Sequence, residues 1–288
     1  MATLKAIRKR IGSVRNTQQI TKAMKMVSAA KLRRAQEAAV AARPYAEKMT
    51  ELLKNVAARV SSTAHPLLTA RDEKKIDLVL FTSDRGLCGG YNANMIRSAE
   101  AFLRQHTQVE SIELTLVGRK GADHFRRRRA NIADRYTDII YKAPDELSAE
   151  IAQKLINRFL NGQTDAVYIL YSRFRSALSQ VPTLEKLLPV ALEQTSEAEA
   201  QQQTEYLYEP NVQALLASLL PRITAVAIQR ALLEATASEH GARMTAMESA
   251  TSNAAKMIGT LTLQMNRARQ ASITRELLEI VGTAEALK

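Results

Sequence analysis

Residues Asn211 to Ser272 read NVQALLASLLPRITAVAIQRALLEATASEHGARMTAMESATSNAAKMIGTLTLQMNRARQAS, and the hydrophobic pattern of these residues predicts the architecture of the chain. Alternating steps of four and three residues mark eighteen positions in it, and fourteen of them are apolar or Ala. They are Val212, Leu216, Leu219, Ile223, Val226, Arg230, Leu233, Ala237, His240, Met244, Met247, Thr251, Ala254, Ile258, Leu261, Met265, Ala268 and Ser272. A period of about 3.5 residues held this long is typical of a helix wound around another helix, because a straight helix drifts out of that phase.

The same steps run through the first sixty residues, where thirteen of seventeen positions are apolar or Ala. They are Leu4, Ile7, Ile11, Val14, Gln18, Thr21, Lys25, Ser28, Leu32, Ala35, Ala39, Ala42, Ala46, Met49, Leu53, Val56 and Val60. We call this line of residues, and its counterpart in the last helix, the seam. The two chain ends are therefore predicted to form a long antiparallel coiled coil, and the many Ala at the seam predict a close approach of the two backbones.

The four polar seam positions lie together, between Gln18 and Ser28. In this stretch the apolar side chains occupy a shifted face made of Ile20, Ala23, Met24, Val27 and Ala30. The shift indicates either a local slip of the seam or a second apolar face that is turned toward something else.

The chain has 288 residues, of which 46% are hydrophobic, enough for two domains or for one core with long helices. Its formal net charge is +12, and ten Lys and Arg residues precede the first acidic residue, Glu37. We therefore expect the first helix to meet protein carboxylates or phosphates. This charge leaves open a basic coiled-coil adaptor that binds nucleic acid or a membrane surface.

The single cysteine, Cys88, excludes an internal disulfide framework and a Cys-based zinc site. The basic N-terminus lacks the apolar core and cleavage site of a secretory signal, and its heptad phase favours a structural helix over a transit peptide. No run approaches the roughly 18 apolar residues of a membrane span. We therefore expect a cytoplasmic protein, soluble or peripheral to a membrane.

Between the two helices the period changes, and short runs of β-formers alternate with helical stretches. This alternation predicts a Rossmann-like α/β domain. We expect strands at 76–82, 112–117 and 166–171, an extended segment at 132–141, and helices at 92–105 and 145–161. We also expect a basic helix between 118 and 129, and a hairpin arm or edge strand at 178–190. The domains are expected at 1–60 (first helix), 61–209 (α/β domain) and 210–288 (last helix). Pro44 predicts a bend or a local break in the first helix, and Pro221 predicts a kink in the first turns of the last helix.

The last helix is longer than the first, by about 30 Å at 1.5 Å per residue. After Ser272 its apolar positions slip by one, to Ile273, Leu277, Ile280, Ala284 and Leu287. A bare apolar helix end needs a socket. The side chains from Arg267 to Leu277 are dense in hydrogen-bonding groups just where the single helix emerges. This favours contact with a surrounding partner over ordinary pairing along one helix.

The loop Ser83 to Gly90 follows a strand and precedes a helix, a place where phosphates are often bound. It lacks the Lys-Ser/Thr of a Walker loop and the dinucleotide glycine pattern, so a tight turn or a partner contact is favoured over an enzyme's nucleotide site. Cys88 has no His at catalytic or metal spacing. The run Arg126 to Arg129 lacks interleaved aromatic residues, which favours a solvated face or an acidic protein partner over nucleic acid.

Six stretches resemble the gamma subunit of the rotary ATP synthase. They are Ile11 to Lys31 (IGSVRNTQQITKAMKMVSAAK), Arg43 to Ala46 (RPYA), Ser83 to Gly90 (SDRGLCGG), Gln180 to Leu188 (QVPTLEKLL), Tyr206 to Pro210 (YLYEP) and Arg267 to Val281 (RARQASITRELLEIV). The resemblance covers the whole chain. It implies a non-catalytic central shaft without a cofactor or metal, turning inside three alpha and three beta subunits of a proton-transporting ATPase at the cytoplasmic face of the cell inner membrane.

The resemblance also implies roles for particular residues, and each role is a contact with a partner subunit. Met24 and Lys25 match the region that faces the acidic loop of beta, while Arg269, Gln270, Thr274 and Glu276 match positions that engage the beta catch loop. Tyr208 and Glu209 match the foot, where the shaft meets the epsilon subunit and the membrane c-ring. No nucleic acid is implied as a partner.

Overall fold

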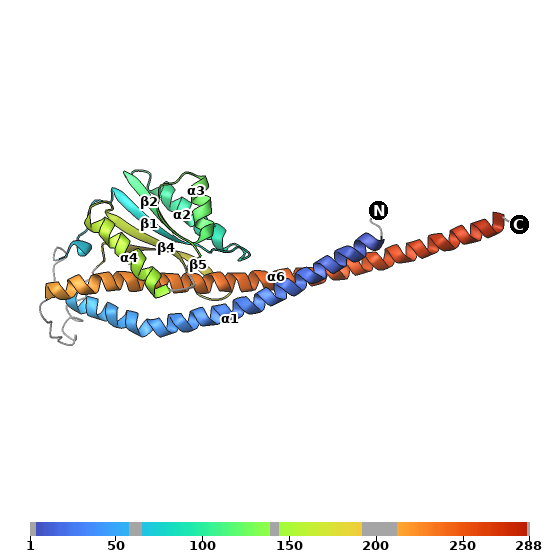
Figure 1. Cartoon of the computed structure of the whole chain (residues 1–288), viewed down its shortest axis with the longest axis horizontal. Helices are drawn as coiled ribbons and strands as arrows, with labels where there is room; N and C mark the ends of the chain where they lie inside the picture. Colours follow the sequence, from blue (N-terminus) through green and yellow to red (C-terminus); the bar gives the residue numbers. More distant parts are fainter. Residues whose placement is uncertain (1–3, 58–64, 139–143, 192–211, 287–288) are drawn as a thin grey trace. The chain divides into compact units, whose positions relative to one another are not determined.

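The computed structural model describes residues 4–57, 65–138, 144–191 and 212–286. Two long terminal helices, α1 (Leu4–Ala57) and α6 (Val212–Ala286), flank a five-stranded sheet in the sequence (Figure 1). The chain divides into two compact units, Met1–Ser28 with Arg243–Lys288, and Ala29–Ala242. The expected domain limits near residues 60 and 210 fall in stretches outside the described residues and stay predictions.

The sheet has the strand order β3-β2-β1-β4-β5. Its strands are β1 (Lys75–Phe81), β2 (Ser111–Val117), β3 (Ile132–Tyr136), β4 (Ala166–Phe174) and β5 (Gln180–Leu188). The first four are parallel, and β5 pairs antiparallel with β4 at one edge. The parallel strands alternate with helices, so the Rossmann-like α/β fold predicted from the sequence is confirmed.

Helices cover both faces of the sheet. On one face, α2 (Tyr91–Gln105) and α3 (Arg119–Arg127) pack on Leu78 and Leu80 of β1. On the other face, α4 (Pro144–Leu160), the short η1 (Pro66–Leu68) and α6 pack on Val79 and Phe81. Because successive strand residues point to opposite faces, the apolar run of β1 serves two cores at once.

α1 remains helical through Pro44, although it is bowed within the unit Ala29–Ala242 (Figure 1). Proline cannot donate to the carbonyl of Val40, one turn earlier, and its ring crowds that carbonyl, which accounts for the bow. Along this stretch the seam residues Ala39, Ala42 and Ala46 line a cavity of about 890 Å³ together with α6. The expected close approach of the two backbones at these Ala residues is therefore wrong here.

α6 likewise continues through Pro221. The sequence predicted that no stretch is apolar enough to cross a membrane. That expectation is wrong for α6 by length and composition, because an 18-residue segment of it has a mean hydropathy of 1.3. A core helix of a soluble protein meets the same criterion of length and composition. Leu216, Leu220 and Ile228 of α6 are each at most 1% exposed and belong to the core beneath the sheet.

Candidate partner-binding site

Polar contacts join α1 to α6 in the unit made of Met1–Ser28 and Arg243–Lys288. The hydroxyl oxygens of Thr21 and Thr251 lie 2.7 Å apart, and Lys25 Nζ lies 2.6 Å from Glu248 Oε1. Residue numbers rise along one helix while they fall along the other, so the helices are antiparallel. The predicted antiparallel pairing of the chain ends is confirmed.

The seam of α1 keeps its phase through the polar stretch. Thr21 and Ser28 are buried, with 8% and 3% of their surface exposed, whereas Ile20 and Val27 are 60% and 57% exposed. The buried hydroxyls are satisfied, since Thr21 bonds to Thr251 and Ser28 Oγ donates to the Met24 carbonyl at 2.8 Å. Of the two hypotheses for this stretch, the second apolar face is therefore correct and the slipped seam is wrong.

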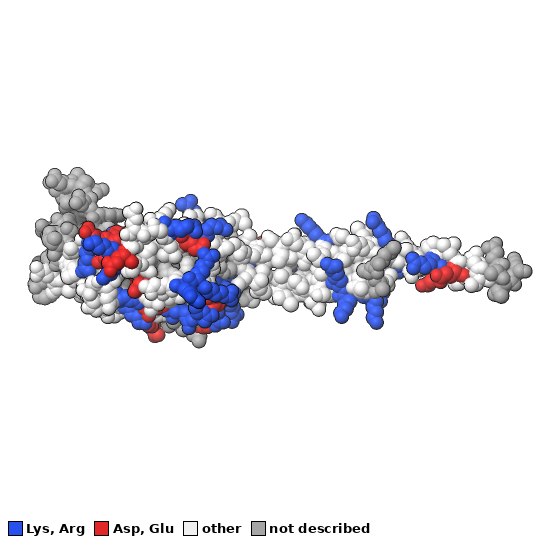
Figure 2. Space-filling view, turned by 90° about the horizontal axis from the view of Figure 1, so that it is seen from above, with Lys and Arg blue, Asp and Glu red and all other residues white. Residues whose placement is uncertain are grey.

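Ile20, Ala23 and Val27 form this exposed apolar face of α1, because residues three and four apart share one side of a helix. Met24 is half-buried between the exposed apolar face and the seam. Lys25 was expected to contact a partner, yet its ammonium bonds to Glu248 within the chain. On the side seen in Figure 2, Lys and Arg side chains project from the helix pair. Along this part of the molecule, acidic side chains are visible only near the end of α6.

Beyond Ala268, every α6 side chain through Thr283 is exposed. Arg269, Gln270, Thr274 and Glu276 all lie in this exposed end. On an ideal helix, Arg269 and Glu276 fall within about 20° of one another, and Gln270 and Thr274 within about 40° on a neighbouring face. The four side chains thus surround more than one side of the helix, an arrangement suited to a partner that encloses it.

The same end exposes large apolar side chains, as the slipped phase after Ser272 predicts. They are Ile273 at 49%, Leu277 at 57%, Leu278 at 67%, Ile280 at 64% and Val281 at 58%. Exposed apolar residues this dense are typical of a surface that binds a partner.

The structure does not bring all predicted contact residues together. Lys25 pairs with Glu248, and Arg269 lies 21 residues farther along α6, or about 30 Å at the helical rise. The two groups are therefore separate sites on the helix pair. Tyr208 and Glu209 lie outside the described residues, so their role stays a prediction.

The loop Ser83–Gly90 uses its polar groups internally. Ser83 Oγ donates to the Arg85 carbonyl at 2.6 Å, and Asn92 Oδ1 accepts from the Ser83 backbone N–H at 3.0 Å. The Asp84 carboxylate accepts from the backbone N–H groups of Arg119 and Asp138, at 3.0 and 3.1 Å. The loop therefore ties the end of β1 to the neighbouring β2–α3 and β3 connections, as a tight turn would.

In open α/β sheets, ligands bind at the carboxyl ends of the strands where the strand order reverses, here between β1 and β4. α6 packs against this place. Ser238 Oγ donates to the carbonyl of Ser172 in β4 at 2.8 Å, and Tyr91 Oη of α2 donates to the Ala235 carbonyl at 3.3 Å. A Cβ on Gly241 would lie 3.1 Å from the Phe174 ring, so the helix fits closely. This packing disfavours an α/β enzyme with a nucleotide at that edge.

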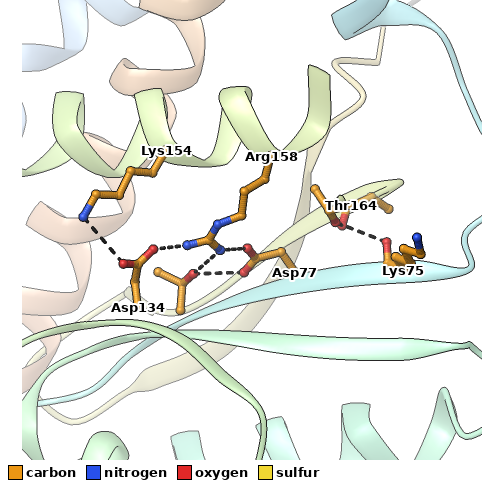
Figure 3. A network of polar contacts seen from close by, with 8 residues as sticks. Lys75, Asp77, Asp134, Lys154, Arg158 and Thr164 are labelled. Carbon is orange, nitrogen blue, oxygen red and sulfur yellow. Dashed lines mark hydrogen bonds and ion pairs between the residues drawn. The ribbon is translucent and has the colours of Figure 1, made fainter. Parts of the chain in front are cut away.

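A buried charged network joins the sheet to α4 (Figure 3). The Arg158 guanidinium donates to the carboxylates of Asp77 and Asp134, and Thr115 Oγ1 donates to Asp77 at 3.0 Å. Burial raises the pKa of Asp77 to about 6, against the opposing effect of Arg158. The network connects β1, β2 and β3 to one helix, and its central carboxylate on Asp77 is 1% exposed, so it serves stability.

Sequence reasoning missed this network and the Lys25–Glu248 contact. The sequence does contain a signal for the buried network, because Asp77 interrupts the apolar run of β1. A carboxylate buried in a sheet needs a cation as its partner. Among the described residues, no group of three or more His, Cys, Asp or Glu side chains could hold a metal ion.

Comparison with known proteins agrees with this geometry. The family model described as ATP synthase matches residues 3–287. The chain is 52% identical over 289 residues to the ATP synthase gamma chain of Geobacter metallireducens, and 50% identical over 292 residues to that of an Anaeromyxobacter species. Both alignments cover 100% of each chain.

Solved structures are similar as well. The central stalk and c-ring structure of the Tetrahymena thermophila mitochondrial ATP synthase contains a chain with 27% identity and a TM-score of 0.62, covering 80% of this chain and 99% of that one. A chain of the Euglena gracilis mitochondrial ATP synthase, at 20% identity and a TM-score of 0.68 over 99% and 94%, shares the fold. The full-length family match and the half-identical relatives show that the chain belongs to the ATP synthase gamma chain family.

Proposed function

We propose that the chain is the central rotor shaft of a proton-translocating ATP synthase. It would couple ion-driven rotation of the membrane ring to ATP synthesis or hydrolysis on the beta subunits, while supplying no catalytic residue itself. The observation that carries this proposal is the end of α6, where every side chain from Arg269 to Thr283 is exposed and several are large and apolar. Such an end requires an enclosing socket.

The shaft would act through its asymmetry. One side of the helix pair presents the exposed apolar face of α1, and the end of α6 presents charged and apolar side chains in different directions. Three identical sites around this shaft would each meet a different surface. A contact that stabilises one conformation of a site shifts the population of that site, so rotation would change the nucleotide affinity of each site in turn.

Two contact regions with beta follow from this proposal. Arg269, Gln270, Thr274 and Glu276 would bind the beta catch loop, since they surround the emerging helix. Met24 and the exposed apolar face beside it would meet the acidic loop of beta, together with Lys25, whose ammonium is shared with Glu248.

The remaining partners are proposed from the family. Three alpha and three beta subunits would surround the shaft, and Tyr208 and Glu209 would contact the epsilon subunit and the c-ring. The complex would carry out ATP synthesis and hydrogen ion transport, with this chain peripheral to the cell inner membrane on its cytoplasmic face.

The test is the double variant Arg269→Ala with Gln270→Ala in the assembled complex. We expect assembly or ATP-driven proton pumping to fall by about tenfold, because a partner contact of this kind contributes about 1–2 kcal/mol. Nucleotide binding by beta should not change. The matched control is Arg97→Ala with Gln105→Ala, which removes an exposed Arg and Gln from α2. Unchanged rotation and pumping in the first variant would show that these side chains make no working contact.

The alternative is a basic coiled-coil adaptor for nucleic acid or a membrane surface, suggested by the ten basic residues before Glu37. It predicts binding to duplex DNA that weakens steeply as salt rises. Absence of binding at low salt would exclude the nucleic-acid version. The full-length similarity to ATP synthase gamma chains disfavours both versions.

A further inference from the structure

A groove lies between α2 and α3 of the α/β domain, within the unit Ala29–Ala242. It has a volume of about 400 Å³, within the range of small-ligand sites. Asn92 and Ile96 of α2 line one side, and charged side chains of α3 line the other. On the side seen in Figure 2, a dense group of Lys and Arg side chains lies over the α/β domain.

Two cations of α3 lie toward opposite ends of this groove. Lys120 and Arg127 both line it and share one face of the helix, because seven residues span nearly two turns, or about 10 Å along the axis. Lys120 is held in place at its backbone, whose N–H donates to the Ser83 carbonyl at 3.0 Å. Its stem passes the loop before α2, where a Cβ on Gly86 would lie 3.8 Å from the Lys120 Cε.

The carboxylates at the groove already have partners. Asp123, which also lines the groove, lies 3.6 Å from an Arg126 guanidinium nitrogen. Glu100, one turn after Ile96 on α2, lies 2.5 Å from the Arg128 guanidinium and 2.9 Å from His124 Nε2. Each carboxylate is therefore used by a cation other than Lys120 or Arg127.

Lys120 and Arg127 remain available for a ligand. Both side chains are exposed, and neither has a hydrogen-bond or ion-pair partner within the described part of the chain. Asn92 belongs to the first turn of α2, and the N-terminal end of a helix adds a positive partial charge. Unpaired charges of one sign in a cleft raise the local concentration of ions of the opposite sign, so the groove favours an anion.

The lining also selects the kind of anion. Ile96 is the single aliphatic residue among the described lining residues, and the Asn92 amide already donates to Ser83 Oγ at 2.8 Å. Apart from the His124 imidazole the described lining has no aromatic ring, so it offers no platform for stacking a nucleobase. A phosphate accepts two bonds from an Arg fork and binds Lys as a point charge. Two cations nearly two turns apart suit two phosphate groups of one chain.

We infer that this groove binds a linear phosphate chain, with one phosphate held by Lys120 and another by Arg127. The chain could be inorganic, as in tripolyphosphate, or the phosphate tail of a nucleotide, since both present the same oxygens. A groove of this size takes such a chain whole, whereas an acidic protein segment would lie mostly outside it. The site does not depend on the rotor function.

Four probes test the class of ligand: tripolyphosphate, orthophosphate, ATP and butanetetracarboxylate, whose charge is similar to that of tripolyphosphate. Calorimetry and phosphorus nuclear magnetic resonance measure their binding to the full chain at neutral pH in about 50 mM salt, where screening is moderate. We expect tripolyphosphate to bind at least about tenfold more tightly than orthophosphate or the carboxylate, and ATP to match it within about threefold. Equal binding of tripolyphosphate and the carboxylate, or ATP binding tenfold more tightly than tripolyphosphate, would overturn the inference.

A double variant then locates the binding. Lys120→Gln with Arg127→Gln should weaken tripolyphosphate by at least about tenfold. The matched control is Arg15→Gln with Lys22→Gln, which removes the same two charges at the same spacing from exposed positions of α1. It should weaken binding by less than about twofold, because no second helix forms a lined groove there. Circular dichroism checks that each variant is folded.

Removing a negative charge from the lining should have the opposite sign. Asp123→Asn should tighten tripolyphosphate by about threefold, since it removes a carboxylate that repels the ligand. Asp72→Asn makes the same change at an exposed position outside the lining and should leave the affinity unchanged. Equal effects of the two Asn variants would contradict a bound ligand in this groove.

Two further outcomes would replace the inference. If both double variants weaken tripolyphosphate equally, the ligand follows the net charge of the chain and occupies no particular site. If no phosphate compound binds, while the folded Lys120→Gln with Arg127→Gln variant fails to assemble with partner subunits, the two cations meet carboxylates of a partner protein. In that case the groove is a protein interface and the small-anion site is wrong.

Discussion

In the α/β domain, the Asp77 side chain is 1% exposed and bonds to Arg158 and Thr115, whereas in the helix pair Lys25 and Glu248 bond across the seam with side chains 38% and 60% exposed. Around this contact the domain buries a carboxylate with its hydrogen-bond partners, and the neighbouring strand residues Leu78, Val79 and Leu80 are fully covered. The helix pair does the reverse in one stretch, where Thr21 and Ser28 are buried and Ile20 and Val27 are exposed.

This contrast separates contacts that stabilise the fold from contacts that select one arrangement of the helices. A buried charge loses its hydration, so removing its partner is expensive. An exposed ion pair keeps most of its hydration and contributes little to stability. A polar layer in a coiled coil instead selects one register, at a cost in stability. We therefore expect substitutions in the domain to unfold it, and substitutions in the polar layer to change the order of the helix pair.

Arg158→Met should have the largest effect, a loss of about 3–5 kcal/mol of unfolding free energy at pH 8, because it leaves Asp77 buried without its cation. Burial already raises the pKa of Asp77 to about 6. Between the unfolded and folded pKa values the native state holds the extra proton, so stability falls as pH rises from about 4 to 6. Without Arg158 the pKa should rise further, and the fall should extend to higher pH.

Urea unfolding at pH 5 and pH 8 measures this effect. The loss should be smaller at pH 5, where Asp77 can be protonated. Arg97→Met, at an exposed position of α2, is the control and should change stability by less than about 0.5 kcal/mol. An equal loss at both pH values would show that packing of Arg158, and not its charge, sets the stability.

The next largest effect on stability is expected from Gly→Ala, which is compared at one position in the α/β domain and one in the helix pair. Gly118 has a φ of 104°, and a Cβ there would lie 2.1 Å from the Thr82 carbonyl oxygen, so Gly118→Ala should destabilise the domain by at least about 2 kcal/mol. Gly12 is exposed inside α1 with nothing within 4 Å of the added carbon. Gly12→Ala should therefore stabilise the helix by about 0.5–1 kcal/mol. Thermal unfolding measures both, and the same sign for the two variants would contradict this account.

Periodicity predicted the elements of the fold well because it reports local burial. The heptad phase placed Thr21 and Ser28 on the seam although both are polar, and the slip after Ser272 predicted the exposed apolar residues at the end of α6. The strand runs were also predicted, since a strand covered on both faces is continuously apolar.

Contacts between distant residues could not be predicted in the same way. Arg158 reaches Asp77 across 81 residues, and that contact depends on the packing angle of α4 on the sheet. Likewise, Ala at the seam is compatible with either close helices or a cavity, and the bow at Pro44 decides between them. The partner contacts of Arg269 and Gln270 rest on family resemblance and stay predictions.

A smaller effect is expected from Thr21→Val together with Thr251→Val. The two side chains keep their shape and lose the bond between their hydroxyls together with bonds to the Gln18 and Met247 carbonyls. Because both partners of the cross-helix bond become apolar, stability should change by less than about 1 kcal/mol. The register of the helices should become less defined, because an apolar layer does not require that pairing. Spin labels at the exposed positions Gln19 and Ser252 measure this as a broader distance distribution.

The control for this pair is Thr17→Val with Thr260→Val. Within the described part of the chain, each of these hydroxyls bonds to a carbonyl of its own helix, at 3.1 and 3.2 Å, and not across the helix pair. The distribution should stay as narrow as in the parent chain. Equal broadening in both double variants would mean that the loss of any threonine hydroxyl, and not the cross-helix contact, loosens the pair.

The smallest effect belongs to Lys25 and Glu248, and it separates two roles for Lys25. In a double-mutant cycle with Lys25→Met and Glu248→Gln, the coupling should be about 0.2–1 kcal/mol and should vanish in about 1 M salt, where charges are screened within about 3 Å. If Lys25 serves mainly this contact, both single variants should alter ATP-driven pumping in the assembled complex equally, and the exchange Lys25→Glu with Glu248→Lys should restore it. If Lys25 instead binds the acidic loop of beta, Lys25→Met should impair pumping while Glu248→Gln does not, and the exchange should make the defect worse.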